Sequence, residues 1–297
     1  MGLRAGGSLR AGAAIAAAVI LSAGACEASH GHTGTKPVSA TSSAAAAPKS
    51  MPKWLVSSAA LKLLAGAGMS SAELTADFDT PSTYLVAGTQ GADDYADAVR
   101  TQTFTSVDAL QSAVERGLDP ATQAVLYDNE AWPLTPTAEQ QDPAAAETRA
   151  AALAHAHHLL LIATPATDLT RILAPGENSY DAYLRLGISS AAAKAADVID
   201  IQAQGSEADT ARYADFVQQA AAAARAANPK VVVLAGISTN PSGQSVTADQ
   251  VGAAIDATRS FVDGYWLNVP QAGNACPRCG TAQPQVAVAL LRTMNSH

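Results

Sequence analysis

Three residues that could do chemistry alternate along Tyr127-Asp128-Asn129-Glu130-Ala131-Trp132, directly after a short apolar run. In an extended chain, side chains two residues apart point to the same side, so the Asp128 and Glu130 backbones would lie roughly 6.5 to 7 Å apart. Two carboxylates this close do not both ionise freely, and one keeps its proton toward neutral pH. A protonated carboxyl is what general acid catalysis requires, and Trp132 offers an apolar platform beside it. The pair is therefore a candidate catalytic pair. A capping Asp and an Arg-paired Glu are the structural alternative.

Two further segments place polar side chains on one face of an expected strand. Asp200, Gln202 and Gln204 alternate with apolar residues, and Trp266 and Asn268 do the same. Buried amides need hydrogen-bond partners, either each other or a polyhydroxylated ligand. These positions are candidate substrate-binding residues. A solvated strand end and a core tryptophan are the alternatives.

Short apolar runs alternate with longer Ala-rich stretches, which is typical of strands alternating with helices in a parallel sheet. The expected strands are 82–87, 101–105, 124–127, 159–163, 198–202, 230–236 and 265–269. The expected helices are 107–116, 143–158, 180–196, 210–227, 248–261 and 284–294. This pattern favours an α/β fold, a (β/α)8 TIM-type barrel with one strand irregular or missing, in 53–78 or 168–178. A doubly wound open sheet is the alternative, although no Gly-x-Gly-x-x-Gly turn supports a dinucleotide site.

In such a barrel the active site lies at the carboxyl ends of the strands, where these polar residues gather. The Asp128-x-Glu130 strand end and the Trp266 strand resemble the chitinase-like group of barrel glycoside hydrolases, whose signature strand ends Asp-x-Asp-x-Glu. The resemblance implies that Glu130 protonates the glycosidic oxygen, that Asp128 orients the substrate's acetamido group and that Trp266 floors the central subsite. The two earlier Asp positions of the signature fall at Gln123 and Leu126 in this sequence.

The N-terminal segment has the pattern of an export signal. Arg4 and Arg10 precede an apolar stretch over 11–23, which is shorter than the roughly 20 residues of a membrane span. Leu21-Ser22-Ala23-Gly24-Ala25-Cys26 resembles the lipobox of bacterial lipoproteins, with Ala23 where Leu is usual, and also suits ordinary signal peptidase. We expect a signal peptide over 1–25, a lipid on Cys26 and a flexible tether over 26–50, leaving 51–297 as a single barrel domain. The expected location is extracytoplasmic and lipid-anchored to the cell membrane, with secretion as the alternative.

The net charge and the cysteine content limit the classes of binding partner and the roles of the cysteines that the sequence allows. The net charge of −8 and a pI near 5.1 argue against nucleic acid, and any membrane contact is expected only through the lipid. With Cys26 assigned to the lipid, Cys276 and Cys279 remain as an even pair. Outside the cytoplasm we expect them to form a local disulfide rather than a redox or zinc site.

No cofactor or metal is expected. His155, His157 and His158 lie near a predicted helix end, but no His-Glu-x-x-His pattern is present and a favourable helix-dipole contact explains them. The favoured function is a cell-surface glycoside hydrolase cleaving a polysaccharide with Glu130 as acid. The alternatives are a carbohydrate-binding lipoprotein without catalysis and a surface scaffold with a protein partner.

Overall fold

The computed structural model of the chain describes residues 51–87, 94–273 and 276–296, and Ser50–His297 forms one compact unit. The predicted signal peptide, Cys26 and tether lie outside the described residues. No helix in the described ranges is long and apolar enough to cross a membrane.

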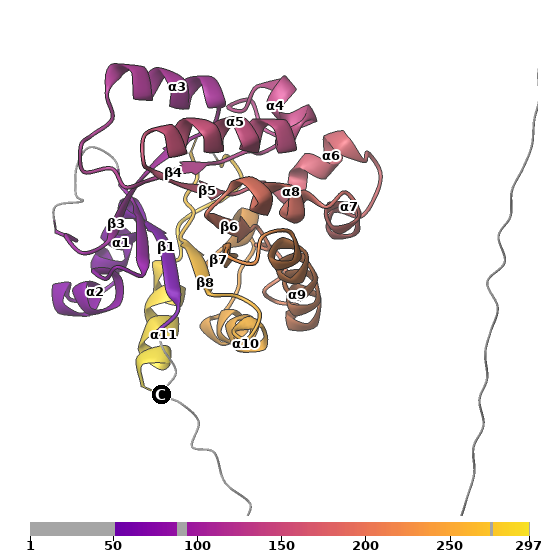
Figure 1. Cartoon of the computed structure of the whole chain (residues 1–297). Helices are drawn as coiled ribbons and strands as arrows, with labels where there is room; N and C mark the ends of the chain where they lie inside the picture. Colours follow the sequence, from indigo (N-terminus) through magenta and orange to yellow (C-terminus); the bar gives the residue numbers. More distant parts are fainter. Residues whose placement is uncertain (1–50, 88–93, 274–275, 297) are drawn as a thin grey trace, which may run out of the picture. The chain divides into compact units, whose positions relative to one another are not determined.

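Eight strands form a closed barrel in sequence order, and each strand pairs in parallel with the next, β8 closing on β1 (Figure 1). The strands are β1 Lys53–Ser57, β2 Thr83–Val86, β3 Val99–Phe104, β4 Ala124–Tyr127, β5 Leu160–Ala163, β6 Val198–Ile201, β7 Val232–Ser238 and β8 Gly264–Asn268. The fold is therefore a (β/α)8 TIM barrel, as the alternation of apolar runs predicts.

Helices lie outside the barrel and follow each strand except β2, after which the described residues run to β3 without a helix (Figure 1). The α-helices are α1 Ser58–Gly66, α2 Ser71–Phe78, α3 Val107–Arg116, α4 Thr137–Gln141, α5 Pro143–Ala156, α6 Thr170–Leu173, α7 Ser179–Arg185, α8 Ile188–Ala195, α9 Thr210–Ala227, α10 Ala248–Thr258 and α11 Pro284–Asn295. Two 3-10 turns, η1 Thr167–Leu169 and η2 Pro241–Gly243, follow β5 and β7.

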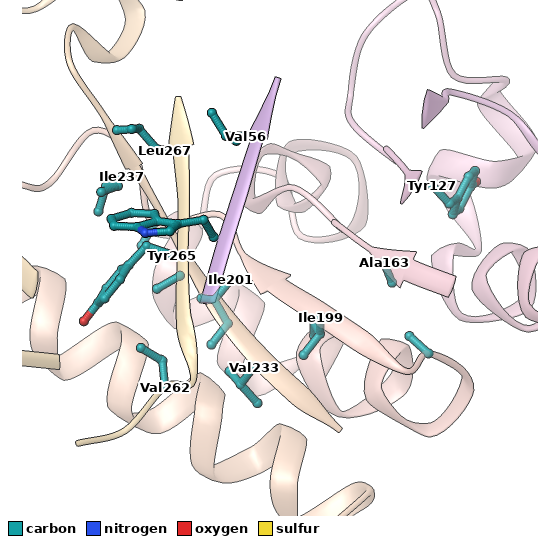
Figure 2. Close-up of a cluster of buried hydrophobic side chains, with 14 of the residues drawn as sticks. Val56, Tyr127, Ala163, Ile199, Ile201, Val233, Ile237, Val262, Tyr265 and Leu267 are labelled. Carbon is teal, nitrogen blue, oxygen red and sulfur yellow. The ribbon is translucent and has the colours of Figure 1, made fainter. Parts of the chain in front are cut away.

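The strands bury both of their faces, which explains their nearly continuous apolar runs. Alternate residues on one face pack under the helices, and Figure 2 shows several of them on β6, β7 and β8. The other face fills the barrel interior with a smaller cluster: Leu55, Tyr84, Ala124, Leu126, Ile162, Val198 and Leu234. This alternation decides which polar residue at each strand end points into the barrel mouth.

The structure adds four helices that were not predicted, α1, α2, α4 and α6, and it differs from the sequence prediction in two further details. The strand that the sequence prediction left unassigned is β1, which lies in the first of the two candidate segments, 53–78. Its Trp54, Leu55 and Val56 are buried. The single helix predicted over 180–196 is two helices, because Gly187 adopts a left-handed conformation with φ of 65° between α7 and α8.

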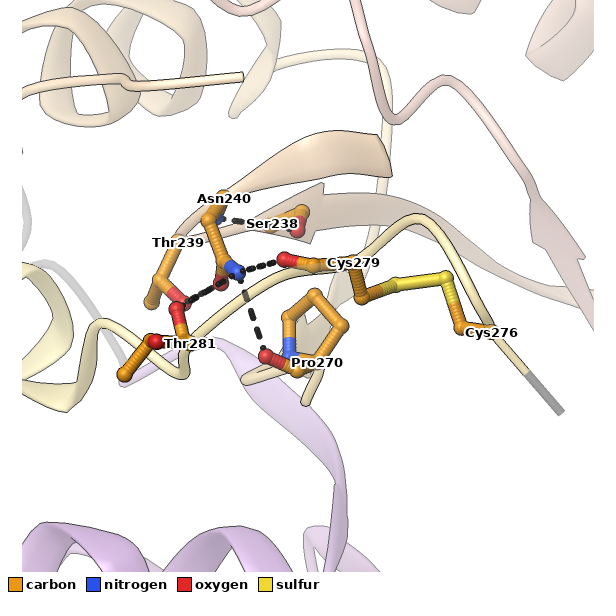
Figure 3. Close-up of a disulfide and its surroundings, with 7 residues drawn as sticks. All are labelled: Ser238, Thr239, Asn240, Pro270, Cys276, Cys279 and Thr281. Carbon is orange, nitrogen blue, oxygen red and sulfur yellow. Dashed lines mark hydrogen bonds between the residues drawn. A yellow bond between two sulfur atoms is a disulfide. The ribbon is translucent and has the colours of Figure 1, made fainter. Parts of the chain in front are cut away.

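The predicted disulfide between Cys276 and Cys279 is present in the segment between β8 and α11 (Figure 3). The Asn240 side-chain amide donates hydrogen bonds to the backbone carbonyls of Cys279, Pro270 and Thr281, at 2.8, 3.2 and 3.2 Å. Asn240 therefore holds this segment against the end of β7.

Candidate active site

Asp128 follows directly after β4 and points into the barrel mouth. Its carboxylate accepts hydrogen bonds from the Thr164 hydroxyl at 2.8 Å and from the Gln202 side-chain amide at 3.3 Å. Leu126, two residues earlier, belongs to the interior cluster, so alternation places Asp128 on the same face. Burial raises the pKa of Asp128 to about 6 and Asp168 adds repulsion, while the two hydrogen bonds oppose the rise.

Glu130 lies two residues further on, beyond the end of the strand, and remains close to Asp128. Burial first, and then the negative charges of Asp128 and Asp168, raise the pKa of Glu130 to about 8. The Gln202 side chain and the positive charge of Arg171 lower the pKa and partly offset this increase. A carboxyl that holds its proton near neutral pH can donate it to a leaving group.

Asp168 and Thr164 complete the surroundings of the pair, and sequence reasoning treated neither as a site residue. Asp168 accepts a 2.9 Å hydrogen bond from the Ala131 backbone amide and lies 3.7 Å from Arg171. This bond ties the segment after β5 to the segment that carries Glu130. The only feature of the sequence that could have indicated these two residues is their position after a predicted strand.

The remaining predicted substrate-binding residues meet across β6, β7 and β8. The Gln202 amide also donates to the Thr164 carbonyl at 2.8 Å, which holds it between β5 and β6. The Gln204 amide covers Gly236 of β7, and a Cβ built there would lie 2.3 Å from Gln204 Cδ. Gly236 pairs in register with Trp266, whose half-buried ring packs against the interior cluster.

Asn268 and Trp132 are the other two predicted substrate-binding residues. Asn268 is the last residue of β8, half-buried and in register with Ser238. Trp132 is also half-buried, and its indole N–H donates a 2.7 Å hydrogen bond to the Thr135 hydroxyl. Gln140 in turn donates to the Trp132 carbonyl at 2.8 Å. The loop after β4 is thus held by its own polar contacts close to Glu130.

Asp200 lies one layer below Gln202 on the same face of β6 and is fully buried. Neither of its carboxylate oxygens has a hydrogen-bond partner among the described residues. Burial, followed by repulsion from Asp128, raises the pKa of Asp200 well above its usual value. Asp200 is therefore a third acidic side chain, which lies below Asp128 and Glu130 and favours its neutral, protonated form.

Gly236→Ala should push the Gln204 amide out of the barrel mouth, because the new methyl group would occupy its place. We expect about tenfold weaker binding of a ligand that hydrogen-bonds to the Gln204 amide, with little change in melting temperature because Gln204 is a flexible side chain. Gly252→Ala on α10 is the control, since its nearest contact would be 3.6 Å away at Leu290. Unchanged ligand affinity in Gly236→Ala would show that Gln204 does not belong to the site.

Glu139 on α4 supports the β4 strand end from behind. Its carboxylate accepts hydrogen bonds from the Tyr127 hydroxyl at 2.6 Å and the Val107 backbone amide at 3.1 Å. Its own backbone carbonyl accepts from the Asn129 side chain. We expect Glu139→Ala to lower the free energy of unfolding by about 3 kcal/mol in urea titrations, because two buried donors lose their acceptor. Glu139→Gln keeps an acceptor and should cost less; equal losses would contradict this account.

The histidine run contributes to a surface contact away from the mouth. His155 on α5 lies 2.9 Å from the Asp197 carboxylate, and His158 adopts a left-handed conformation as α5 turns toward β5. The described ranges contain no group of three or more His, Cys, Asp or Glu side chains arranged to hold a metal ion.

The two signature positions without Asp have structural roles of their own. Leu126 fills the barrel interior, and the Gln123 side chain accepts a hydrogen bond from the Arg100 backbone amide at 3.0 Å. Only the last two acidic positions of the chitinase-like signature are therefore matched.

No protein-family model matches the sequence, and comparison with curated proteins gives no significant match. Solved structures of similar fold include a chitinase from Chromobacterium violaceum ATCC 12472, with 14% identity over 83% of this chain and 99% of that one and a TM-score of 0.44. Triosephosphate isomerase from Bartonella henselae gives 11% identity over 73% and 92%, with a TM-score of 0.41. A Rhizomucor miehei β-1,3-glucanosyltransferase gives 11% over 69% and 76%, with a TM-score of 0.36. This distant likeness extends across several kinds of barrel enzyme and specifies no activity.

Proposed function

We propose that this chain is a glycoside hydrolase that cleaves a polysaccharide by acid catalysis with Glu130. The observation that carries the proposal is the Glu130 carboxyl, whose pKa is raised to about 8 beside Asp128 at the mouth of the barrel. Catalytic residues of barrel enzymes lie at this end of the strands. Perturbed carboxyl pairs occur more often at functional sites than elsewhere, which favours a site over a purely structural pair.

In the proposed reaction, Glu130 donates its proton to the glycosidic oxygen while the bond from that oxygen to the anomeric carbon breaks. The leaving sugar departs as an alcohol, and Glu130 becomes a carboxylate. By analogy with the chitinase-like group, Asp128 orients the substrate's acetamido group, whose oxygen attacks the anomeric carbon. Glu130 then takes a proton from the water that opens this intermediate. Asp128 is already held by Thr164 and Gln202, so its position is set before substrate arrives.

The substrate would contact amides and aromatic rings. Gln202, Gln204 and Asn268 offer hydrogen-bonding groups for sugar hydroxyls, and Trp266 and Trp132 offer flat apolar surfaces on which sugar rings stack. The site requires no cofactor for this chemistry. The proposed partner is therefore a carbohydrate, with no nucleic acid, in keeping with the net charge of −8.

The proposal is tested by incubating the protein with a panel of amino-sugar and neutral polysaccharides and measuring new reducing ends. Hydrolysis of at least one glycan by the wild type, and its loss in Glu130→Gln, is the expected result. Equal release by the two proteins would contradict it.

A carbohydrate-binding protein without catalysis is the second candidate, and the observation that favours it is the absence of Asp at Gln123 and Leu126. The same amides and tryptophans would then bind a glycan that is never cleaved. Glycan-array binding that is unaffected by Glu130→Gln, together with no release of reducing ends, would favour this candidate.

We also propose that the protein works outside the cytoplasm, anchored to the cell membrane by a lipid on Cys26. The support is the basic and apolar pattern of 1–25 and the lipobox-like residues before Cys26. Labelling cells with a fatty-acid probe should mark the wild type, and Cys26→Ala should lose the label and enter the medium or the soluble fraction. A labelled Cys26→Ala variant would overturn the proposed attachment point.

A further inference from the structure

Backbone pairing between the segments after β4 and β5 continues past the ends of both strands. The Thr164 amide donates to the Tyr127 carbonyl at 3.1 Å, and the Ala166 amide donates to the Asn129 carbonyl at 2.9 Å. On both chains the second bond lies two residues beyond the first, which is the even spacing of a parallel ladder. The two segments therefore remain paired as far as Asn129, the residue that precedes Glu130.

The Asp168 side chain makes the next bond in this series. Its Oδ1 accepts a 2.9 Å hydrogen bond from the amide of Ala131, two residues beyond Asn129. This amide belongs to the peptide unit that joins Glu130 to Ala131, so the bond lies directly beside the backbone of Glu130. Asp168 therefore extends the register of the two segments by one further step, across Glu130.

This register decides the direction in which the Glu130 side chain points. Asp128 points into the barrel mouth, and in an extended segment a side chain two residues further on lies on the same side. The chain turns immediately afterwards, where the Glu130 carbonyl accepts a 2.9 Å hydrogen bond from the Trp132 amide. The bond between Ala131 and Asp168 fixes the place of that turn, and so keeps Glu130 on the side of Asp128.

Asp168 also acts on Glu130 through its charge. Its side chain is 24% exposed, and Oδ2 lies 3.7 Å from Arg171. The charged groups that face Glu130 are Asp128 after β4, Asp168 on η1 and Arg171 on α6. The two carboxylates raise the pKa of Glu130 and the guanidinium lowers it. Asp168 raises the pKa of Asp128 as well. One side chain thus places the Glu130 segment and favours the protonated form of its carboxyl.

We propose that Asp168 is a positioning residue, which holds the Glu130 carboxyl beside Asp128 and acts through Glu130 rather than on the substrate. Its role in turnover rests on the proposed hydrolysis, whereas its effect on Glu130 can be measured without any substrate. A misplacement of about 1 Å at a catalytic group can lower a rate by about 10²-fold, so a positioning contact of this kind has a measurable effect.

The first measurement is a carbon-13 NMR titration of the Glu side-chain carboxyls, in which the Glu130 resonance is identified by its absence from Glu130→Gln. In the wild type it should titrate near pH 8. Asp168→Asn keeps an acceptor for the Ala131 amide but removes the charge, so the midpoint should move to lower pH. Asp168→Ala also removes the acceptor, and the midpoint should fall further because the released segment exposes Glu130 to solvent. Asp181→Asn, an exposed change on α7, is the control and should titrate as the wild type does.

The second measurement is the pH profile of glycan hydrolysis. Asp168→Asn should shift both limbs of the profile to lower pH, because Asp168 raises the pKa values of both Asp128 and Glu130. Asp168→Ala should lower kcat by about 10²-fold with a smaller change in KM, since it misplaces the acid without touching the substrate. A role in stability alone would leave both limbs where they are.

Two outcomes of the titration would overturn the proposal. They are a Glu130 midpoint in Asp168→Asn equal to that of the wild type, and a midpoint in Asp168→Ala equal to that of Asp168→Asn. If no glycan is hydrolysed, the proposed function fails, and the titration decides the positioning role by itself. If Asp168→Ala does not fold, Asp168→Leu, which has a similar shape to Asn but no acceptor, takes its place in both measurements.

Discussion

Replacing Glu130 by Gln is expected to lower glycan hydrolysis by about 10²- to 10⁴-fold, the usual contribution of a general acid. Gln keeps the shape and hydrogen-bonding capacity of the side chain but has no proton to give to the glycosidic oxygen. Glycan binding should change little, so the loss should appear in kcat rather than KM. Steady-state kinetics on the best substrate of the panel measures both constants.

The pH profile gives an independent check on the same residue. Glu130 donates a proton only below its raised pKa, so the rate should fall as pH rises through about 8. If Asp128 works as a carboxylate, the rate should also fall as pH drops through about 6. Glu115→Gln, a surface change on α3, is the matched control and should keep both the rate and the profile. A Glu130→Gln variant that retains the wild-type rate would exclude Glu130 as the acid.

The second prediction with a large expected effect concerns the dependence of the free energy of unfolding on pH. Burial raises the pKa of Asp200 and Glu147 well above their usual values, so the folded chain holds protons that the unfolded chain releases. The stability that these groups contribute is fully present below their unfolded pKa values of about 4 and is lost as pH rises toward their folded values. Each pH unit over which one extra proton is retained should cost about 1.4 kcal/mol. The free energy of unfolding should therefore fall from pH 5 to pH 8, and urea titrations across that range measure it.

Asp200→Asn isolates one of these groups. The variant should be more stable than the wild type at pH 8 and differ least at pH 4, because the amide never ionises. Asp215→Asn on the exposed surface of α9 is the control and should follow the wild-type curve. A wild-type stability that rises from pH 5 to pH 8, with Asp200→Asn parallel to it, would show that Asp200 is ionised in the folded protein.

The sequence predicted the barrel and the strand ends because both depend on local patterns. Apolar runs of β4 and β6 are short and uninterrupted, and the polar residues that follow alternate with the period of a strand. Those two signals placed Asp128, Glu130, Gln202 and Gln204 near the carboxyl ends of their strands. The break at Gly187 was missed because a glycine between two helical stretches also fits one continuous helix.

The amino-acid order by itself determined the class of fold, the candidate pair and the cysteine pairing, since each depends on residues close together in the chain. Only the tertiary structure decided what surrounds the pair. Asp128 bonds Thr164 and Gln202, which lie 36 and 74 residues away, and closing the barrel is what brings them together. Burial is equally a property of the whole fold, so the raised pKa values of Glu130 and Asp200 had no local signal. Strand periodicity is encoded residue by residue, whereas desolvation and charge repulsion arise when distant segments pack.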